Sequence, residues 1–207
     1  MRLSSKDALA LRCRVSVHLR TATLCLAAGS ATSAHAAVIH WSNANLVIPA
    51  TIDGLYINVE TRATGSAGSV VAGWDINPYS ATSLTWFNAT GTGMMRYPGV
   101  TAGSAGNLAG GTVVGATGSY GSGAVVVGAA AGNWVLNSVN IFGFRFVAAD
   151  GLTHYGYGFM SVGAAITTRT LTDVFYEDVA ATSITVVPAP GAIALLGLAG
   201  LAGRRRR

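Results

Sequence analysis

The sequence predicts an all-β fold, a single antiparallel β-sandwich or barrel-like domain, on three observations. Helical periodicity is hard to find in the middle of the chain. Short runs that alternate apolar and polar residues are frequent there, and turn-forming residues separate several of them. A chain of 207 residues is long enough for one domain whose apolar core stabilises it. We therefore expect one β domain over residues 37–186, with a targeting segment at each end.

Ten runs have the length and composition of strands. Turn chemistry of the glycine, proline, asparagine and aspartate type separates several of them. The expected strands are 37–41, 54–60, 69–76, 83–87, 93–97, 133–136, 140–149, 152–162, 171–176 and 183–187. The expected turns are Asp53-Gly54, Asn77-Pro78, Pro98-Gly99 and Asp150-Gly151.

The clearest unit is a hairpin around Asp150-Gly151. This pair suits the positive φ angles of a two-residue type I′ turn, which would pair Ala149 with Leu152. In that register six aromatic side chains share one side of the ribbon, and we expect them in the core; a platform that stacks sugars is the alternative. The six are Phe142, Phe144, Phe146, Tyr155, Tyr157 and Phe159.

The other side of this predicted hairpin is rich in glycine, so another backbone or a ligand can approach it closely. On that side Arg145 and His154 would be diagonal neighbours, a possible ligand face with a proton-transferring histidine. A hydrogen-bonded structural histidine is the more common case, since no nucleophile accompanies it. The side comprises Gly143, Arg145, Val147, His154, Gly156 and Gly158.

Residues 99–132 are rich in glycine and alanine and carry no charge. We expect loops and short edge strands here, for example at 112–114 and 124–127. The alternative is a self-associating segment, because uncharged β-branched runs pair readily at sheet edges.

Residues 1–36 read as a signal peptide. Five basic residues lie within the first 20 positions, the apolar run 22–28 follows, and Ala34 and Ala36 supply the small side chains that signal peptidase accepts. Cleavage is expected between Ala36 and Ala37. Both cysteines precede that bond, so the mature body would have neither disulfides nor thiol chemistry.

Residues 187–207 have three parts in order: a proline-containing motif, an apolar run over 191–203 and a terminal arginine cluster. The prolines keep the backbone extended and accessible. The run is short for a stable span, and the arginines would stop it at the cytoplasmic side. The motif is Val187, Pro188, Ala189, Pro190 and Gly191; the cluster is Arg204, Arg205, Arg206 and Arg207.

This tail resembles the PEP-CTERM sorting domain of bacterial proteins that exosortase, a membrane protease-transpeptidase, processes. Ala189 stands where that family has glutamate, which leaves the sorting enzyme open, and a plain uncut tail anchor is the alternative. The body segments 143–146, 153–156 and 176–177 also resemble many uncharacterised PEP-CTERM proteins. The resemblance implies an exported β protein tethered by its C-terminal helix to the inner membrane, at least at first, and later placed in the envelope or extracellular matrix.

The formal charge of +5 belongs to the two ends. Only four arginines and no lysine lie between them, against seven acids, so no nucleic-acid footprint is expected. We find no nucleophile elbow, metalloprotease motif, phosphate-binding loop or dinucleotide fingerprint, and we expect no metal and no cofactor. Asp75-Ile76-Asn77 begins like a calcium loop, but the residues that follow break the pattern, which favours a turn cap.

These observations favour an exported, noncatalytic envelope or matrix protein that is sorted through its tail after signal peptidase cleavage and is either surface-anchored or associated with exopolysaccharide. A carbohydrate-binding module or adhesin is the first alternative, with Trp41, Trp74, Trp86 or Trp134 as stacking residues if exposed. A glycoside hydrolase that uses two carboxylates is the second. Its candidate acids are Asp173, Glu177 and Asp178.

Overall fold

The computed structural model describes residues 36–97 and 103–188, and this part of the chain consists of antiparallel β-sheets without an α-helix. The all-β prediction is confirmed. The two targeting segments lie outside the described residues, apart from Ala36 and the first two residues of the tail motif, Val187 and Pro188. In the part described, the sheets are open at both ends and no barrel closes.

Two sheets and a two-stranded ribbon make up the fold. The larger sheet has the order β1-β13-β12-β11-β7-β9, with β2 also paired to β13. Its strands are β1 (Val38–Trp41), β2 (Leu46–Val47), β7 (Gly93–Met95), β9 (Tyr120–Gly121), β11 (Ser138–Val147), β12 (Thr153–Val162) and β13 (Arg169–Glu177). The second sheet, in the order β10-β6-β5-β3-β4, has β3 (Tyr56–Ile57), β4 (Thr64–Gly65), β5 (Ile76–Tyr79), β6 (Thr85–Asn88) and β10 (Gly123–Ala124). The ribbon pairs β8 (Val113–Val114) with β14 (Ile184–Thr185), and a short 3₁₀ helix, η1, covers Gly68–Val70.

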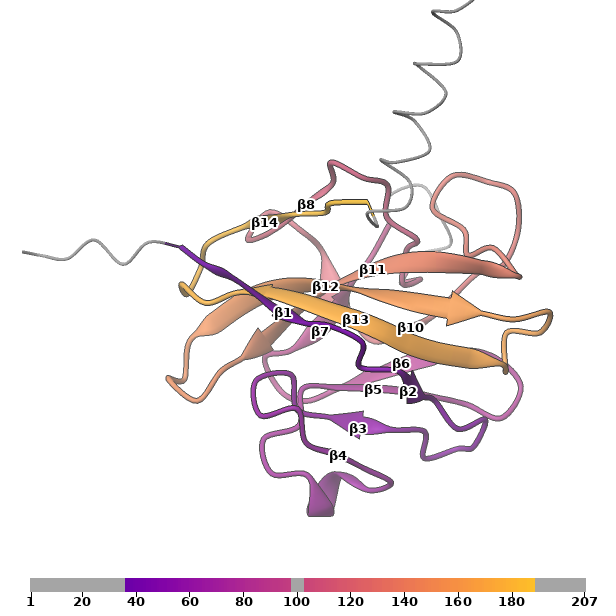
Figure 1. Cartoon of the computed structure of the whole chain (residues 1–207), viewed down its shortest axis with the longest axis horizontal. Helices are drawn as coiled ribbons and strands as arrows, with labels where there is room; N and C mark the ends of the chain where they lie inside the picture. Colours follow the sequence, from indigo (N-terminus) through magenta and orange to yellow (C-terminus); the bar gives the residue numbers. More distant parts are fainter. Residues whose placement is uncertain (1–35, 98–102, 189–207) are drawn as a thin grey trace, which may run out of the picture. The chain divides into compact units, whose positions relative to one another are not determined.

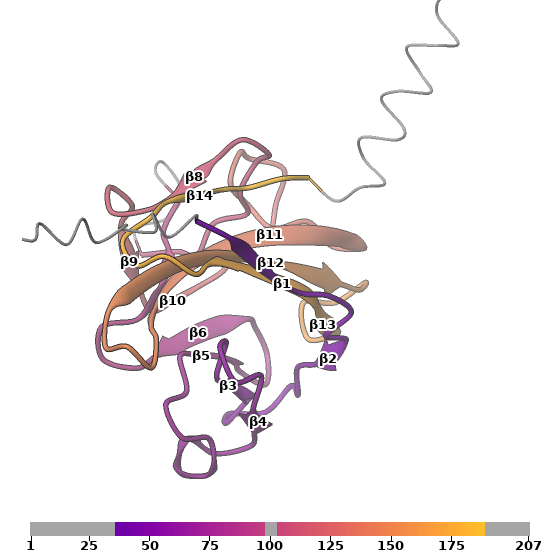
Figure 2. The same ribbon diagram turned by 60° about the vertical axis from the view of Figure 1, so that its left-hand side comes forward.

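The long strands β11, β12 and β13 form the middle layer of three, as Figures 1 and 2 show. The five-stranded sheet lies on one side of them and the β8–β14 ribbon on the other. Both faces of the middle sheet are therefore buried, each against its own apolar cluster. The first cluster is centred on Trp86, Trp134, Phe142, Phe144 and Phe146. The second contains Leu108, Val114, Tyr155, Tyr157, Phe159, Ile184 and Val186.

The β11–β12 hairpin corrects the predicted register by one residue. Its loop has three residues instead of two: Ala148 N–H donates to Leu152 O (3.1 Å), Gly151 N–H donates to Ala148 O (2.9 Å), and Gly151 has φ of +76°. This is a type I turn closed by a left-handed glycine, which adds one residue to the type I′ loop that the sequence favoured. The observed pairs are Phe146 with His154, Phe144 with Gly156 and Phe142 with Gly158.

A shift of one residue moves every side chain of one strand to the other face. The six aromatics therefore divide, three phenylalanines facing the five-stranded sheet and Tyr155, Tyr157 and Phe159 facing the ribbon. The predicted glycine side does not exist. Instead, Gly156 and Gly158 lie beneath phenylalanine rings: a Cβ on Gly156 would be 2.5 Å from Phe144 Cζ.

Three other predictions about local structure are wrong. Residues 69–75 hold the end of η1, a bend and a turn, and strand β5 starts only at Ile76. Residues 133–136 contain a single isolated bridge at Trp134. Asn77-Pro78 lies inside β5: proline is tolerated there because β3 pairs with β5 at one position only, and Pro78 O accepts Leu55 N–H (3.1 Å).

The glycine- and alanine-rich segment forms loops and short edge strands over its described residues, 103–132, as expected. Strand β9 ends the larger sheet, β10 ends the second, and β8 belongs to the ribbon. The segment thereby covers the outer face of the long strands, and Leu108 and Val114 are buried in it.

Arg169 ties the larger sheet to the loops that bound the smaller one. Its guanidinium is buried and donates to Ser83 O, to Ser80 O (2.8 Å) and to Pro49 O (3.1 Å). Burial lowers the pKa of this arginine to about 10, so it stays charged at neutral pH. Three carbonyl oxygens take the place of a carboxylate partner.

Candidate functional site

The outward face of the five-stranded sheet carries a cluster of aromatic side chains. In β3, β5 and β6 the residues Ile57, Ile76 and Trp86 point into the core and are fully buried. Side chains alternate along a strand, so Tyr56, Tyr79 and Phe87 point outward. Trp74 precedes β5 and joins them through its contacts with Tyr56 and Phe87. We call the resulting cluster the outer aromatic face; it consists of Tyr56, Trp74, Tyr79 and Phe87.

Three of these four rings are linked by direct contacts. Trp74 meets Tyr56 edge-on, with centroids 4.9 Å apart, and stacks on Phe87 at 5.6 Å. Phe87 is 49% exposed although it is large and apolar, and the adjacent Ile52 is 79% exposed. Exposed apolar side chains that gather on one face are typical of a binding surface.

A shallow groove of about 210 Å³ runs across this face. Its floor includes Asn77, which is almost fully buried and whose Nδ2 donates to Asp53 O at 2.8 Å. The groove thus places a fixed amide beside partly exposed aromatic rings. Its lining residues are Ile52, Tyr56, Asn77, Tyr79 and Phe87.

Two glycines allow neighbouring loops to pack closely against the outer aromatic face. Gly68 in η1 lies against the rings of Tyr56 and Trp74, and a Cβ there would be 2.7 Å from Trp74 Nε1. Gly54 has φ of +61°, and a Cβ there would be 2.1 Å from Pro78 O. Both positions therefore require glycine, which fixes how closely the loops approach β5.

The four tryptophans differ in solvent exposure, which decides which of them can stack on a sugar ring. Trp86 and Trp134 are fully buried, while Trp41 and Trp74 are half-buried. Trp41 lies under the guanidinium of Arg62, 5.8 Å from the ring centroid. Trp74 alone of the four belongs to the outer aromatic face.

The sequence patterns did not point to Tyr56, Tyr79 or Phe87. A signal for Phe87 was present in the Trp86-Phe87 pair: adjacent residues in a strand point to opposite faces, so one of two consecutive aromatics must point away from the core. Nothing in the sequence brought Tyr56 or Trp74 near that position, because the pairing of β3 with β5 is nonlocal.

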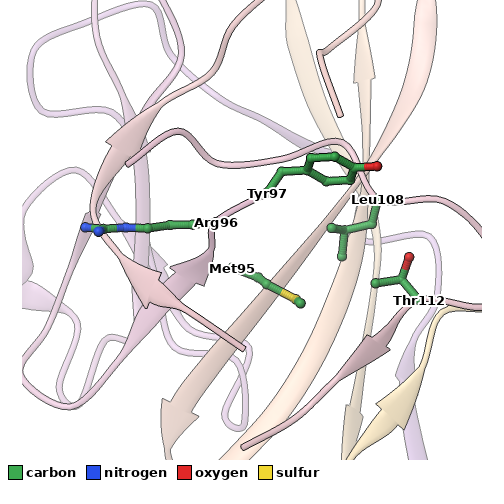
Figure 3. A pocket seen from close by; sticks show the side chains of 5 residues that line it. All are labelled: Met95, Arg96, Tyr97, Leu108 and Thr112. Atoms are coloured by element: carbon green, nitrogen blue, oxygen red, sulfur yellow. The ribbon is translucent and has the colours of Figure 1, made fainter. Parts of the chain in front are cut away.

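A second hollow of about 320 Å³ lies between β7 and residues 108–112. Figure 3 shows the side chains of Met95, Tyr97, Leu108 and Thr112 gathered around it, while Arg96 points away. Its walls are mainly apolar, and no charged group faces it among these residues. It contains one partly exposed aromatic ring, that of Tyr97, instead of a cluster of rings in contact.

A third cavity, of about 300 Å³, is lined by two carboxylates. Asp75 is almost fully buried and accepts Val59 N–H at 2.8 Å, while Glu60 accepts Ala149 N–H at 2.8 Å. Burial raises the pKa of Asp75 to about 7; the Val59 hydrogen bond opposes this, and the charge of Glu60 adds to it. Asp75 therefore supports the loop after β3, as a turn cap would.

The predicted ligand face of Arg145 and His154 is wrong, because the observed register places the two residues on opposite sides of the hairpin. Arg145 packs over the ring of Tyr120, 5.1 Å from its centroid. His154 is buried, and its two ring nitrogens meet Glu177 O (2.9 Å) and Asp150 Oδ2 (3.1 Å). Burial lowers the pKa of His154, but these two acceptors outweigh it and the net shift is upward. It is a hydrogen-bonded structural histidine.

The three acids suggested for hydrolysis each have a local hydrogen-bonding partner. Asp173 Oδ1 lies 2.9 Å from His40 Nε2, Asp178 Oδ1 accepts Ala37 N–H (2.7 Å), and the buried Glu177 accepts Val179 N–H (3.5 Å). None of the three lines any of the cavities described above. Within residues 36–97 and 103–188, no group of three or more histidine, aspartate or glutamate side chains is arranged to hold a metal ion.

No family model matches this chain, and neither a curated protein nor a solved structure does. Among the described residues, no helix has the length and apolar character needed to cross a bilayer. The predicted membrane segment 191–203 lies outside that part of the chain.

Proposed function

We propose that this chain is an exported, noncatalytic envelope or matrix protein whose β domain binds polysaccharide on the outer aromatic face. One observation carries the binding proposal: the partly exposed rings of Tyr56, Trp74 and Phe87 contact one another beside a groove floored by Asn77. The C–H faces of a sugar ring pack on aromatic side chains, and its hydroxyls need polar partners; the groove offers both.

The charge distribution favours a neutral polymer. Of the four arginines in the described residues, Arg169 is buried and Arg145 lies on Tyr120 of the larger sheet. Arg62 covers Trp41, and Arg96 follows β7. No cation is among the residues that line the groove, so an acidic polysaccharide would find no counter-charge there.

Export and sorting are proposed on the sequence features at the two ends. In this account signal peptidase cuts before Ala37, and the tail from Val187 holds the protein at the inner membrane for an exosortase-type enzyme. Release or retention at the surface would then place the β domain beside the cell's own exopolysaccharide.

Affinity electrophoresis tests the binding proposal. Native gels would contain hydroxyethyl cellulose, galactomannan, dextran or, as the acidic comparison, alginate. We expect at least one neutral polymer to retard the protein, and Trp74→Ala and Phe87→Ala to weaken retardation about tenfold each, which corresponds to about 1.4 kcal/mol.

The matched control is Trp41→Ala, which removes the other half-buried tryptophan from the larger sheet. It should leave retardation unchanged. If none of the neutral polymers retards the wild-type protein, or if all three variants behave alike, the outer aromatic face is not a polysaccharide site.

A further inference from the structure

The first described hydrogen bonds of the chain join Ala37 to Asp178. Ala37 N–H donates to the Oδ1 atom of Asp178 at 2.7 Å, and Asp178 N–H donates to Ala37 O at 3.1 Å. The second bond joins the two backbones one position beyond the pair of Val38 with Glu177, and the first adds the Asp178 side chain to this end of the sheet. Ala37 is exposed, so solvent can reach this end of β1.

Cleavage of the bond between Ala36 and Ala37 would change the chemistry of this contact. In the uncut chain Ala37 N is a neutral amide, whereas in a chain that starts at Ala37 it is an ammonium group. The uncut contact already has a charged acceptor, the Asp178 carboxylate; cleavage adds a positive charge on the donor and turns the hydrogen bond into an ion pair. The distance of 2.7 Å already lies in the range of an N⁺–H···O⁻ contact.

We propose that removal of the leader creates an ion pair between the new α-ammonium group of Ala37 and the carboxylate of Asp178, which fastens the mature N-terminus to the end of β13. The proposal rests on the proposed cleavage before Ala37 and is independent of polysaccharide binding. It makes Asp178 a positioning residue for the processed end of the chain.

The surrounding charges fit this role. Among the described residues, the side-chain ion pairs are His40 with Asp173 and His154 with Asp150, so Asp178 has no cationic side chain as partner. The titratable groups of β13 next to Ala37 are Glu177, opposite Val38, and Tyr176, opposite Ile39. Neither is a cation. Arg62, whose charge acts on Tyr176, lies over Trp41 and forms no ion pair with Asp178.

The composition allows a selective test. Lys6 is the only lysine of the 207 residues, so a chain that begins at Ala37 has its α-amino group as its single primary amine. The full chain would be expressed with its leader, the exported product purified, and its N-terminus established by intact mass. Reductive methylation with ¹³C-formaldehyde then gives one NMR signal, whose pH titration reports the pKa of the amine.

We expect the pKa of the labelled amine to be about half a unit or more higher in the wild type than in Asp178→Asn, because a nearby opposite charge favours the charged form. Asp53→Asn is the control, since it removes one exposed carboxylate from a loop beside β5. It should leave the amine's pKa at the wild-type value.

Two results would overturn the proposal, and they are distinguishable. A product whose mass shows a start other than Ala37 refutes the cleavage position and the ion pair with it. A product that starts at Ala37 but titrates identically with and without the Asp178 carboxylate refutes the ion pair alone. Both leave the polysaccharide proposal standing.

Discussion

Asp75 has a buried carboxylate, and its surroundings disfavour the charged form. The side chain is almost fully buried, and the only hydrogen bond it accepts from the described residues comes from Val59 N–H. Burial and the charge of Glu60 raise its pKa from near 4 to about 7. The folded state therefore binds more protons than the unfolded state between these two values, and stability falls as pH rises across that range.

Replacing Asp75 by asparagine keeps an acceptor for Val59 and removes the buried charge. We expect Asp75→Asn to match the wild type near pH 4 and to be more stable at pH 8, by on the order of 2–4 kcal/mol. Urea unfolding at a series of pH values measures this difference.

Asp53→Asn serves as the control, because Asp53 is exposed and the substitution removes the same charge. Its stability should follow the wild-type pH profile. Parallel profiles for Asp75→Asn and the wild type would show that Asp75 titrates normally and that its burial carries no energetic cost.

At the scale of the element, the β11–β12 hairpin depends on phenylalanine rings that pack over glycines of the paired strand. Gly156 is paired with Phe144, and a Cβ at Gly156 would lie 2.5 Å from both Phe144 Cζ and Phe175 O. The ring can move, but the backbone oxygen of the next strand cannot move without disturbing the β12–β13 ladder. Glycine at this position therefore specifies the register as well as permitting it.

Gly156→Ala should destabilise the protein by about 2–3 kcal/mol, as overpacking in a closed core does. The comparison is Gly151→Asn in the turn, where no atom lies within 4 Å of the Cβ position and asparagine tolerates the positive φ. That variant should cost less than about 1 kcal/mol, measured by urea unfolding. Equal costs at the two positions would contradict the packing of Phe144 over Gly156.

At the scale of the whole molecule, sequence patterns predicted the β class and the long strands but not how they face. The runs 140–149, 152–162 and 171–176 correspond to β11, β12 and β13, because long alternating runs carry a strong periodic signal. The register failed on one loop residue, since Asp150-Gly151 suits both a two-residue and a three-residue loop. The extra loop residue places His154 and Arg145 on opposite faces of the hairpin.

The candidate site was harder to predict from the sequence than the fold. Its strands are two to four residues long, too short for a periodic signal, and Trp74 precedes β5 outside any strand. Its rings meet only after β3 has paired with β5 across the intervening β4 and η1, and after β5 and β6 have formed their hairpin. Catalytic motifs do not indicate the outer aromatic face either, because the residues of an aromatic binding face have no fixed spacing in sequence.

The measurement that tests the account most directly is a fluorescence titration of the exported protein with hydroxyethyl cellulose, galactomannan and dextran. Trp86 and Trp134 are buried and Trp41 lies on the other sheet, so only Trp74 reports on the outer aromatic face. We expect a saturable change in tryptophan emission with at least one neutral polymer and no change in Trp74→Phe. A wild-type spectrum that none of these polymers alters, or a response that persists in Trp74→Phe, would contradict polysaccharide binding at this face.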